Sequence, residues 1–272
     1  MTQRLLRPLL IIGVLLFSSV QAEPLIIGDT FQVDSKILHE KRRINVYMPP
    51  GYAESATLRV PVLYMPDGGI GEDFLHIAGL VQVSVSNGTM RPFLLVGIEN
   101  TERRRDLTGP TKNEQDRKIA PRVGGSAPFR RFIRDELMPQ VAARYRTTDE
   151  TAIIGESLAG LFVIETLMIE PQLFDTYIAI DPSLWWNDQQ LINEADARLG
   201  SLAKPGATLY FSSSGEAQLA ETANRLAEIL TRHPPANLRW HYERSPEEKH
   251  STIYHPAALR SFRKLFGPEE TH

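Results

Sequence analysis

The sequence contains no cysteine among its 272 residues. Disulfide bonds, a cysteine nucleophile and thiolate metal sites are therefore excluded, and the fold must depend on its core. A surplus of basic residues is also missing, because the formal net charge is −3 at pH 7. This balance gives no electrostatic basis for binding nucleic acid or an anionic membrane surface.

The N-terminus lacks an apolar stretch of membrane-spanning length. Its apolar run extends only from Leu9 to Phe17, far fewer than the roughly 20 residues that a spanning helix requires. Arg4 and Arg7 precede this run and Val20-Gln21-Ala22 closes it, which is the order of a secretory signal peptide. We expect cleavage after residue 22 and no stable membrane association afterwards; an uncleaved anchor is the alternative.

The remaining composition is ordinary for a globular protein, with 42% apolar and 23% charged residues. The length suits one large α/β domain or two small ones. Because the sequence shows no internal repeat and no low-complexity linker, we expect a single domain over residues 23–272.

Short apolar runs alternate with segments of helical period along this domain. Such alternation predicts a mostly parallel sheet covered by helices on both faces, here preceded by an antiparallel hairpin. The predicted strands lie near residues 31–39, 42–52, 61–69, 92–100, 151–155, 176–181, 208–215 and 238–243. The predicted helices lie near residues 72–85, 128–145, 158–169, 190–199 and 217–230.

One polar stretch interrupts the alternation. Residues 100–126 are rich in charge, glycine and proline. A loop of this length inside a compact domain is usually functional or mobile.

A serine stands at a turn between a predicted strand and a predicted helix, in the sequence TAIIGESLAG of residues 151–160. A strained turn of this kind exposes the nucleophile of α/β-hydrolases in the motif G-x-S-x-G, and small residues allow the strand and helix to approach. Here Gly155 and Gly160 flank Ser157, while Ala159 replaces the usual second glycine. We expect Ser157 to be a nucleophile; the alternative is a helix cap.

A nucleophilic serine needs a base, and in this fold the base follows it in the chain. His250 lies in a polar loop between the last predicted strand and the last predicted helix, where it could reach Ser157. We therefore expect His250 to be the base. The other histidines after Ser157 suit a helix end, a strand and a first helical turn, and they are His233, His241 and His255.

Two carboxylates could orient that base. Glu216 follows the strand predicted near residues 208–215, and Asp181 follows the strand before it. We favour Glu216 and keep Asp181 as the rival, although a carboxylate in a first helical turn also stabilises the helix dipole.

An oxyanion formed at the ester carbonyl needs backbone N–H donors. One would come from Leu158, the residue after the nucleophile. The other would come from the sequence MPDGG after the third predicted strand, where Gly68 and Gly69 permit a close approach. Asp-Gly-Gly is also simply a good turn.

An ordered set of motifs covering nearly the whole mature chain resembles the putative-esterase family of α/β-hydrolases, which includes esterase D, feruloyl esterases, mycolyltransferases and siderophore esterases. The motif DPSLWWN is similar to one of the siderophore-esterase branch, with Asp181 where serine is usual. The other motifs that carry the resemblance are SKILHEKRRINVYMPPGY, VLYMPDGG, VGIENTERRRDLTGP, IIGESLAG and KHSTIYHPAALR.

The resemblance implies Ser157 as nucleophile, His250 as base, an oxyanion N–H at Gly69 and Glu216 as acid. Some siderophore esterases of this family work with a Ser-His dyad, so the acid could also be dispensable. Trp185 and Trp186 would line an acyl or aromatic pocket, with core packing as an equal alternative. Arg103 and Arg105 could meet an anionic substrate, with a solvated run of charge as the alternative.

These observations predict a periplasmic or secreted serine esterase that needs no metal or cofactor and acts on a small-molecule ester. We lean towards a siderophore-type or small acyl ester. An acyltransferase of the same family would share every motif, and a non-catalytic binding protein on the same fold is the alternative of another class. The sequence predicts no oligomeric state.

Overall fold

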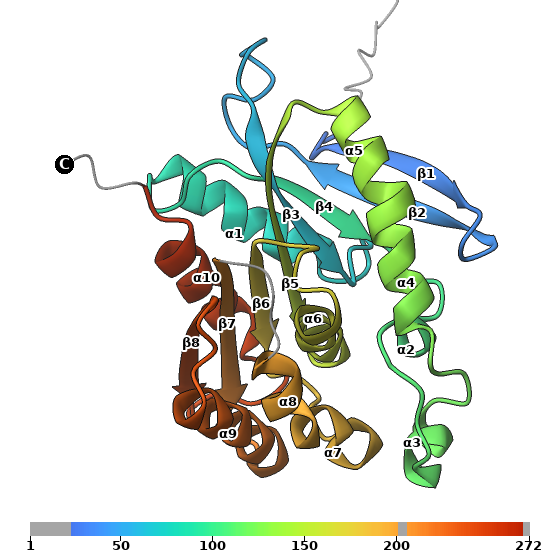
Figure 1. Ribbon diagram of the computed structural model, residues 1–272. Coiled ribbons are helices and arrows are strands. Elements are labelled where there is room, and N and C mark those ends of the chain that lie inside the picture. The colour runs from blue at the N-terminus through green and yellow to red at the C-terminus, as the bar shows by residue number, and fades with distance from the viewer. Residues whose placement is uncertain (1–22, 201–205, 269–272) are drawn as a thin grey trace, which may run out of the picture.

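The computed structural model of the protein describes residues 23–200 and 206–268. The predicted signal peptide, residues 1–22, lies outside the described residues. Eight strands form one twisted sheet in the order β1-β2-β4-β3-β5-β6-β7-β8 (Figure 1). The strands are β1 (Asp29–Ser35), β2 (Glu40–Tyr47), β3 (Val60–Pro66), β4 (Leu94–Ile98), β5 (Thr147–Glu156), β6 (Thr176–Ile180), β7 (Ala207–Ser214) and β8 (Leu238–Ser245).

Strand directions follow the prediction of a mixed sheet that is parallel over most of its width. The N-terminal pair β1 and β2 is antiparallel, and β2 pairs antiparallel with β4. From β4 through β8 the neighbouring strands are parallel. The carboxyl ends of β3, β5, β6 and β7 therefore meet at one edge of the sheet, which is where ligands bind in open α/β sheets.

Helices cover both faces of this sheet, as predicted. Helices α1 and α10 lie together on one face, and the remaining longer helices lie on the other (Figure 1). The helices are α1 (Phe74–Ser86), α2 (Arg103–Asp106), α3 (Glu114–Ile119), α4 (Ser126–Phe132), a π-helical turn η1 (Ile133–Leu137), α5 (Met138–Arg144), α6 (Leu158–Ile169), α7 (Trp186–Asn193), α8 (Ala195–Gly200), α9 (Ala217–Arg232) and α10 (Tyr254–Leu265).

The two faces have separate apolar cores because side chains alternate along each strand. In β3, Leu63 and Met65 pack in the core beneath α1 and α10, whereas Val62 and Tyr64 pack in the larger core beneath α6. Every residue of β3 is buried. This explains the continuous apolar run in its sequence, which is typical of a central parallel strand.

The polar stretch of residues 100–126 was expected to be a long loop, and it instead contains α2 and α3. A buried arginine anchors it to the sheet. Arg42 of β2, fully buried, forms ion pairs with Asp106 of α2 and with Glu40, and Arg105 bonds both of these carboxylates. We call these four residues the arginine network. Hydropathy patterns do not reveal the buried Arg42 or the partly exposed Arg105, and the ion pairs of these two arginines hold this segment in an ordered structure.

Among the described helices, none combines the length and the apolar character that a membrane span requires.

Candidate active site

Ser157 occupies a strained turn between β5 and α6. Its backbone has φ +61° and ψ −119°, a conformation that a non-glycine residue holds only where the surroundings enforce it. A Cβ on Gly155 would lie 2.6 Å from the Cβ of Ala159, and one on Gly160 would lie 3.0 Å from the carbonyl oxygen of Ile180. Packing therefore requires glycine at position 155 and leaves little room for a side chain at position 160, while alanine at position 159 is accommodated.

The imidazole of His250 faces this serine, as the sequence indicated. Its Nε2 lies 3.0 Å from Ser157 Oγ. The loop between β8 and α10 carries His250, and its backbone N–H donates to Glu216 Oε1 at 2.9 Å. The side chain is about one-third exposed, so substrate can reach the pair of residues from solvent.

The carboxylate on the other side of the imidazole is that of Asp181, at the end of β6. Its Oδ2 lies 2.7 Å from His250 Nδ1, and its Oδ1 accepts the backbone N–H of Ser214 at 2.8 Å. The carboxylate is fully buried, and the backbone of Asp181 has a positive φ of +44°.

This geometry corrects the expected choice of Glu216 as the acid. Glu216 bonds the backbone of His250, not its ring, because it lies one strand further from Ser157 in the sheet order. It fixes the loop that carries the histidine. Asp181, kept above as the rival, takes the position behind the imidazole.

The electrostatic surroundings favour a charged imidazole. The hydrogen bond to Asp181 raises the pKa of His250 above its ordinary value; partial burial opposes this, and the charges of Glu156 and Glu216 add to it. A raised pKa makes His250 a stronger base once it is neutral.

Ser183, which was not among the expected site residues, also contacts Ser157. Its hydroxyl lies 3.3 Å from Ser157 Oγ, and its backbone N–H donates to the carbonyl of Ser157 at 3.0 Å. The only signal in the sequence was its place just after β6, at the same edge of the sheet.

The predicted oxyanion donors have different environments. Leu158 opens α6, where the first N–H groups have no acceptor within the helix. Gly69 follows β3, the neighbour of β5, so it lies at the same edge. Its N–H donates to the Glu72 carboxylate at 2.7 Å, so in this structure the expected oxyanion donor is occupied by a side chain of the protein.

The two arginines expected to meet an anionic substrate are both bound to carboxylates of the protein. The guanidinium of Arg103 donates two hydrogen bonds, of 2.6 and 2.8 Å, to the Asp67 carboxylate. Arg105 belongs to the arginine network and contacts Glu40 and Asp106. In this structure Arg103 is therefore paired with the turn after β3, and Arg105 is paired with carboxylates of β2 and α2.

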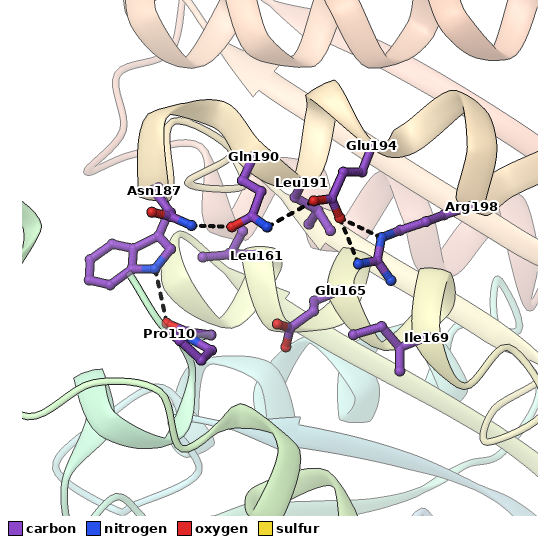
Figure 2. A pocket seen from close by; sticks show the side chains of 11 residues that line it. Pro110, Leu161, Glu165, Ile169, Asn187, Gln190, Leu191, Glu194 and Arg198 are labelled. Atoms are coloured by element: carbon purple, nitrogen blue, oxygen red, sulfur yellow. Dashed lines mark hydrogen bonds and ion pairs between the residues drawn. The ribbon is translucent and has the colours of Figure 1, made fainter. Parts of the chain in front are cut away.

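Trp185 and Trp186 follow β6 in the chain and have different surroundings. Trp186 is buried, donates its indole N–H to the carbonyl of Gly109 at 3.2 Å, and walls a cavity of about 210 Å³. Trp185 is half-buried and packs against the same core. Figure 2 shows this cavity between Glu165 of α6 and the paired Glu194 and Arg198.

Ser157, His250 and Asp181 do not line this cavity. Its lining begins on α6 at Leu161, one turn beyond Ser157, and continues along the helix to Ile169. Trp186 therefore combines core packing with a place in the wall of this neighbouring cavity, whereas Trp185 packs against the core without lining it.

Metal chemistry has no evident site in the described part of the chain. There, no group of three or more histidine, aspartate or glutamate side chains is arranged to hold a metal ion.

Comparison with known families matches residues 35–266 to a model described as putative esterase. The chain is 25% identical over 261 residues to the ferri-bacillibactin esterase BesA of Bacillus subtilis, which covers 86% of this chain and 88% of that protein. It is 40% identical over 95 residues to a siderophore triacetylfusarinine C esterase of Aspergillus fumigatus, covering 34% of this chain and 30% of that one.

Solved structures show the same likeness in three dimensions. An IroE-like serine hydrolase from Shewanella oneidensis has a TM-score of 0.80 at 28% identity, over 88% of this chain and 80% of that one. The BES protein from Bacillus cereus has a TM-score of 0.77 at 21% identity, over 89% and 97%. With the strand order, these likenesses confirm the predicted α/β-hydrolase fold.

Proposed function

The chain belongs to the putative esterase family, and on that premise we propose that it is an exported serine esterase acting through Ser157, His250 and Asp181. The observation that carries the proposal is the continuous path of hydrogen bonds from Ser157 Oγ through both ring nitrogens of His250 to the buried Asp181 carboxylate. The likeness to a protein described as a serine hydrolase supports it.

Acylation begins when Ser157 Oγ attacks the ester carbonyl carbon and its proton passes to His250 Nε2. The carbonyl π electrons move to the oxygen, which becomes an oxyanion. Asp181 holds the ring in the required tautomer and stabilises the imidazolium. Collapse of this intermediate breaks the bond to the alcohol oxygen, which leaves with the proton from Nε2.

Deacylation repeats these steps with water. A water molecule gives a proton to His250 Nε2 and adds to the acyl carbon. Collapse then breaks the bond to Ser157 Oγ, which recovers the proton. The products are a carboxylic acid and an alcohol, and the enzyme returns to its starting state.

We assign the oxyanion to the N–H groups of Leu158 and Gly69. Because Gly69 donates to Glu72 in the resting structure, the Glu72 carboxylate must rotate away when the substrate carbonyl arrives. N–H donors that are positioned in advance lower the barrier because they already point at the oxygen on which negative charge develops in the transition state. Glu72 therefore keeps the second donor covered until substrate binds.

The substrate we propose is a siderophore-type or small acyl ester, since one relative is named a ferri-bacillibactin esterase and another a siderophore triacetylfusarinine C esterase. The basic and apolar start of the chain supports export to the periplasm or the medium, with residues 1–22 as the signal peptide. Residues 23–272 then act as one domain.

The test is turnover of p-nitrophenyl butyrate by the purified mature chain, followed by bacillibactin and triacetylfusarinine C with and without iron. We expect Ser157→Ala to lower kcat/KM by about 10⁴- to 10⁶-fold, as loss of a triad nucleophile does. Ser183→Ala is the matched control, with a loss of about tenfold or less expected. Full turnover by Ser157→Ala would refute the proposal.

A further inference from the structure

A second pocket, separate from the cavity that Trp186 walls, lies between α3, the start of α7 and the start of α9. Its volume is about 540 Å³, and it shares no lining residue with that cavity. In Figure 1 the three helices lie along the lower end of the view, where β7 and β8 end. We call it the α3–α7 pocket, and the esterase mechanism described above gives it no role.

Two short connections place the α3–α7 pocket beside the proposed nucleophile and base. Trp185, in its lining, comes two residues after Ser183, whose hydroxyl lies 3.3 Å from Ser157 Oγ. Gln218, also in its lining, comes two residues after Glu216, whose carboxylate accepts the backbone N–H of the base at 2.9 Å. Because two residues span at most about 7 Å of chain, a group attached to the ester under attack can reach this pocket.

The apolar part of the lining consists of Trp185 and Ile119, which come from different elements. Ile119, the last residue of α3, is 47% exposed, and Trp185 is half-buried. An indole offers a large flat face on which another aromatic ring can stack. An aromatic group bound in the pocket would remove apolar surface of both side chains from water, which is favourable in proportion to the area covered.

Side-chain amides supply most of the polar lining. Two of them are engaged within the chain: Asn113 donates to a carboxylate of α7, and Gln189 accepts from an arginine of α9. The amides of Gln115 and Gln218 differ, because within residues 23–200 and 206–268 neither has a hydrogen-bond partner. An amide both donates and accepts hydrogen bonds, so these two side chains suit uncharged polar substituents on a ligand.

The charged part of the lining is entirely negative, with Asp116 and Asp188 as its members. Their carboxylates accept hydrogen bonds from uncharged donors, namely a threonine hydroxyl at 2.7 Å, a backbone N–H at 2.9 Å and an asparagine amide at 2.7 Å. Arg117 and Lys118 belong to α3 but do not line the pocket, and Arg117 donates to a backbone carbonyl at 3.0 Å. An anionic group in the pocket would therefore meet two carboxylates and no cation of the lining.

We propose that the α3–α7 pocket binds an uncharged aromatic acyl group of the ester and disfavours an anionic one. This inference rests on the proposed esterase function and deepens it by naming the charge of the preferred substrate. The ring lies against Trp185 and Ile119, and the amides of Gln115 and Gln218 bond its polar substituents.

Two esters of the same shape test this preference. 4-Nitrophenyl 3-(4-carbamoylphenyl)propanoate ends in a carboxamide, and 4-nitrophenyl 3-(4-carboxyphenyl)propanoate ends in a carboxylate at neutral pH. Methylene groups separate each aromatic ring from the ester, so the two differ little in reactivity towards hydroxide. We expect wild-type kcat/KM to favour the carboxamide by about tenfold or more, which corresponds to one charge repulsion avoided at close range.

Variants then assign the preference to this pocket. Gln218→Arg places a guanidinium in the lining and should reduce the carboxamide-to-carboxylate ratio by about fivefold or more, whereas Gln218→Glu should raise the ratio. Gln82→Arg, the same change at an exposed glutamine of α1, is the matched control and should leave the ratio unchanged. Ile119→Ala, at an exposed position, should lower kcat/KM for the carboxamide ester relative to p-nitrophenyl butyrate by about threefold or more.

The outcomes separate this inference from the function on which it rests. If Ser157→Ala retains full turnover of p-nitrophenyl butyrate, the serine esterase itself is refuted. If Ser157 is required but the wild-type ratio is one or lower, or p-nitrophenyl butyrate is cleaved and neither aromatic ester is, the role of the α3–α7 pocket is overturned. A ratio that Gln218→Arg leaves unchanged, together with an Ile119→Ala variant that keeps the wild-type preference, overturns it as well.

Discussion

Two groups of charged side chains differ in how their carboxylates are compensated. In the arginine network, Glu40 and Asp106 each face a guanidinium. At the end of β5 and before α1, the carboxylates of Glu156 and Asp73 make no hydrogen bond or ion pair among the described residues. The same residue type accordingly shows opposite shifts: partial burial would raise the pKa of Glu40, but the hydrogen bond from Arg105 and the charge of Arg42 lower it, whereas the pKa of Glu156 is raised to about 7.

The difference separates carboxylates that ion pairs tie into the fold from carboxylates that have no bonded cation. Removing charges from water is repaid only when partners are close and well aligned. The arginine network has such partners and orders the segment of residues 100–126. Glu156 has no bonded cation, and burial raises its pKa against the charges of His250 and Arg103. Perturbed titration of this kind is common at functional sites.

The largest effect expected within this comparison comes from the acid at the nucleophile. Asp181→Asn should lower kcat/KM for p-nitrophenyl butyrate by about 10²- to 10⁴-fold, because the amide leaves His250 in the wrong tautomer and the imidazolium unstabilised. Glu216→Gln, which keeps an acceptor for the backbone N–H of His250, should cost about tenfold or less. Equal losses in the two variants, or a larger loss for Glu216→Gln, would contradict the assignment of the acid.

Breaking the arginine network should affect folding and not chemistry. Arg42→Met leaves the buried Asp106 carboxylate with fewer partners and should lower the free energy of unfolding by about 3–5 kcal/mol. Urea denaturation measures this, and kcat per correctly folded molecule should stay within about twofold at a temperature where the variant is folded. A variant of wild-type stability would show that the network does not hold the segment.

Most of the fold could be predicted from the sequence because strand and helix periods are local properties. β3 is apolar on both faces and α9 on one, and these patterns do not depend on distant residues. The strained turn at Ser157 was also predictable, since Gly155 and Gly160 lie at close contacts between β5, α6 and the end of β6.

What could not be predicted depends on which strands are neighbours. Asp181 and Glu216 both follow strands, and only the position of β6 next to β5 places Asp181 behind His250. The partners of Arg103 and Arg105 were equally unpredictable, because Asp67 follows β3 and Glu40 belongs to β2, both distant in the sequence. Glu156 was not recognised in the sequence. The raised pKa of its carboxyl depends on burial and on neighbours from distant parts of the chain, which no local pattern reveals.

The pH profile of the reaction sharpens the comparison at the histidine. Because the base must be neutral, kcat/KM for an uncharged ester should rise with pH through the pKa of His250, and the bond to Asp181 places that midpoint above the ordinary value of 6.5. Asp181→Asn should move the midpoint to lower pH, and Glu156→Gln should move it in the same direction by less. A midpoint that stays in place in both variants would contradict the described electrostatics.

The smallest effect expected is on thermal stability, with opposite signs for the two groups. A carboxyl whose folded pKa is raised from 4.5 to about 7 destabilises the protein increasingly as pH rises through that window. Glu156→Gln should therefore raise Tm by about 2–4 °C at pH 8 and leave it nearly unchanged at pH 4.

Glu40→Gln is the counterpart in the arginine network. The pKa of Glu40 is lowered in the folded state, so the stability that its charge contributes is present above pH 4.5 and is lost as pH falls through the folded pKa. This variant should lower Tm at pH 8. Differential scanning fluorimetry at the two pH values measures both variants, and shifts of the same sign at pH 8 would contradict the contrast between the two groups.

The most direct measurement of the central claim is covalent labelling of the mature protein with a fluorophosphonate, followed by mass spectrometry of the peptide that contains Ser157. The expected result is a single phosphonyl adduct on Ser157, formed at least about 10²-fold more slowly in His250→Ala because the serine then has no base. Absence of an adduct on Ser157 in the wild-type protein, or labelling that is just as fast in His250→Ala, would contradict the account.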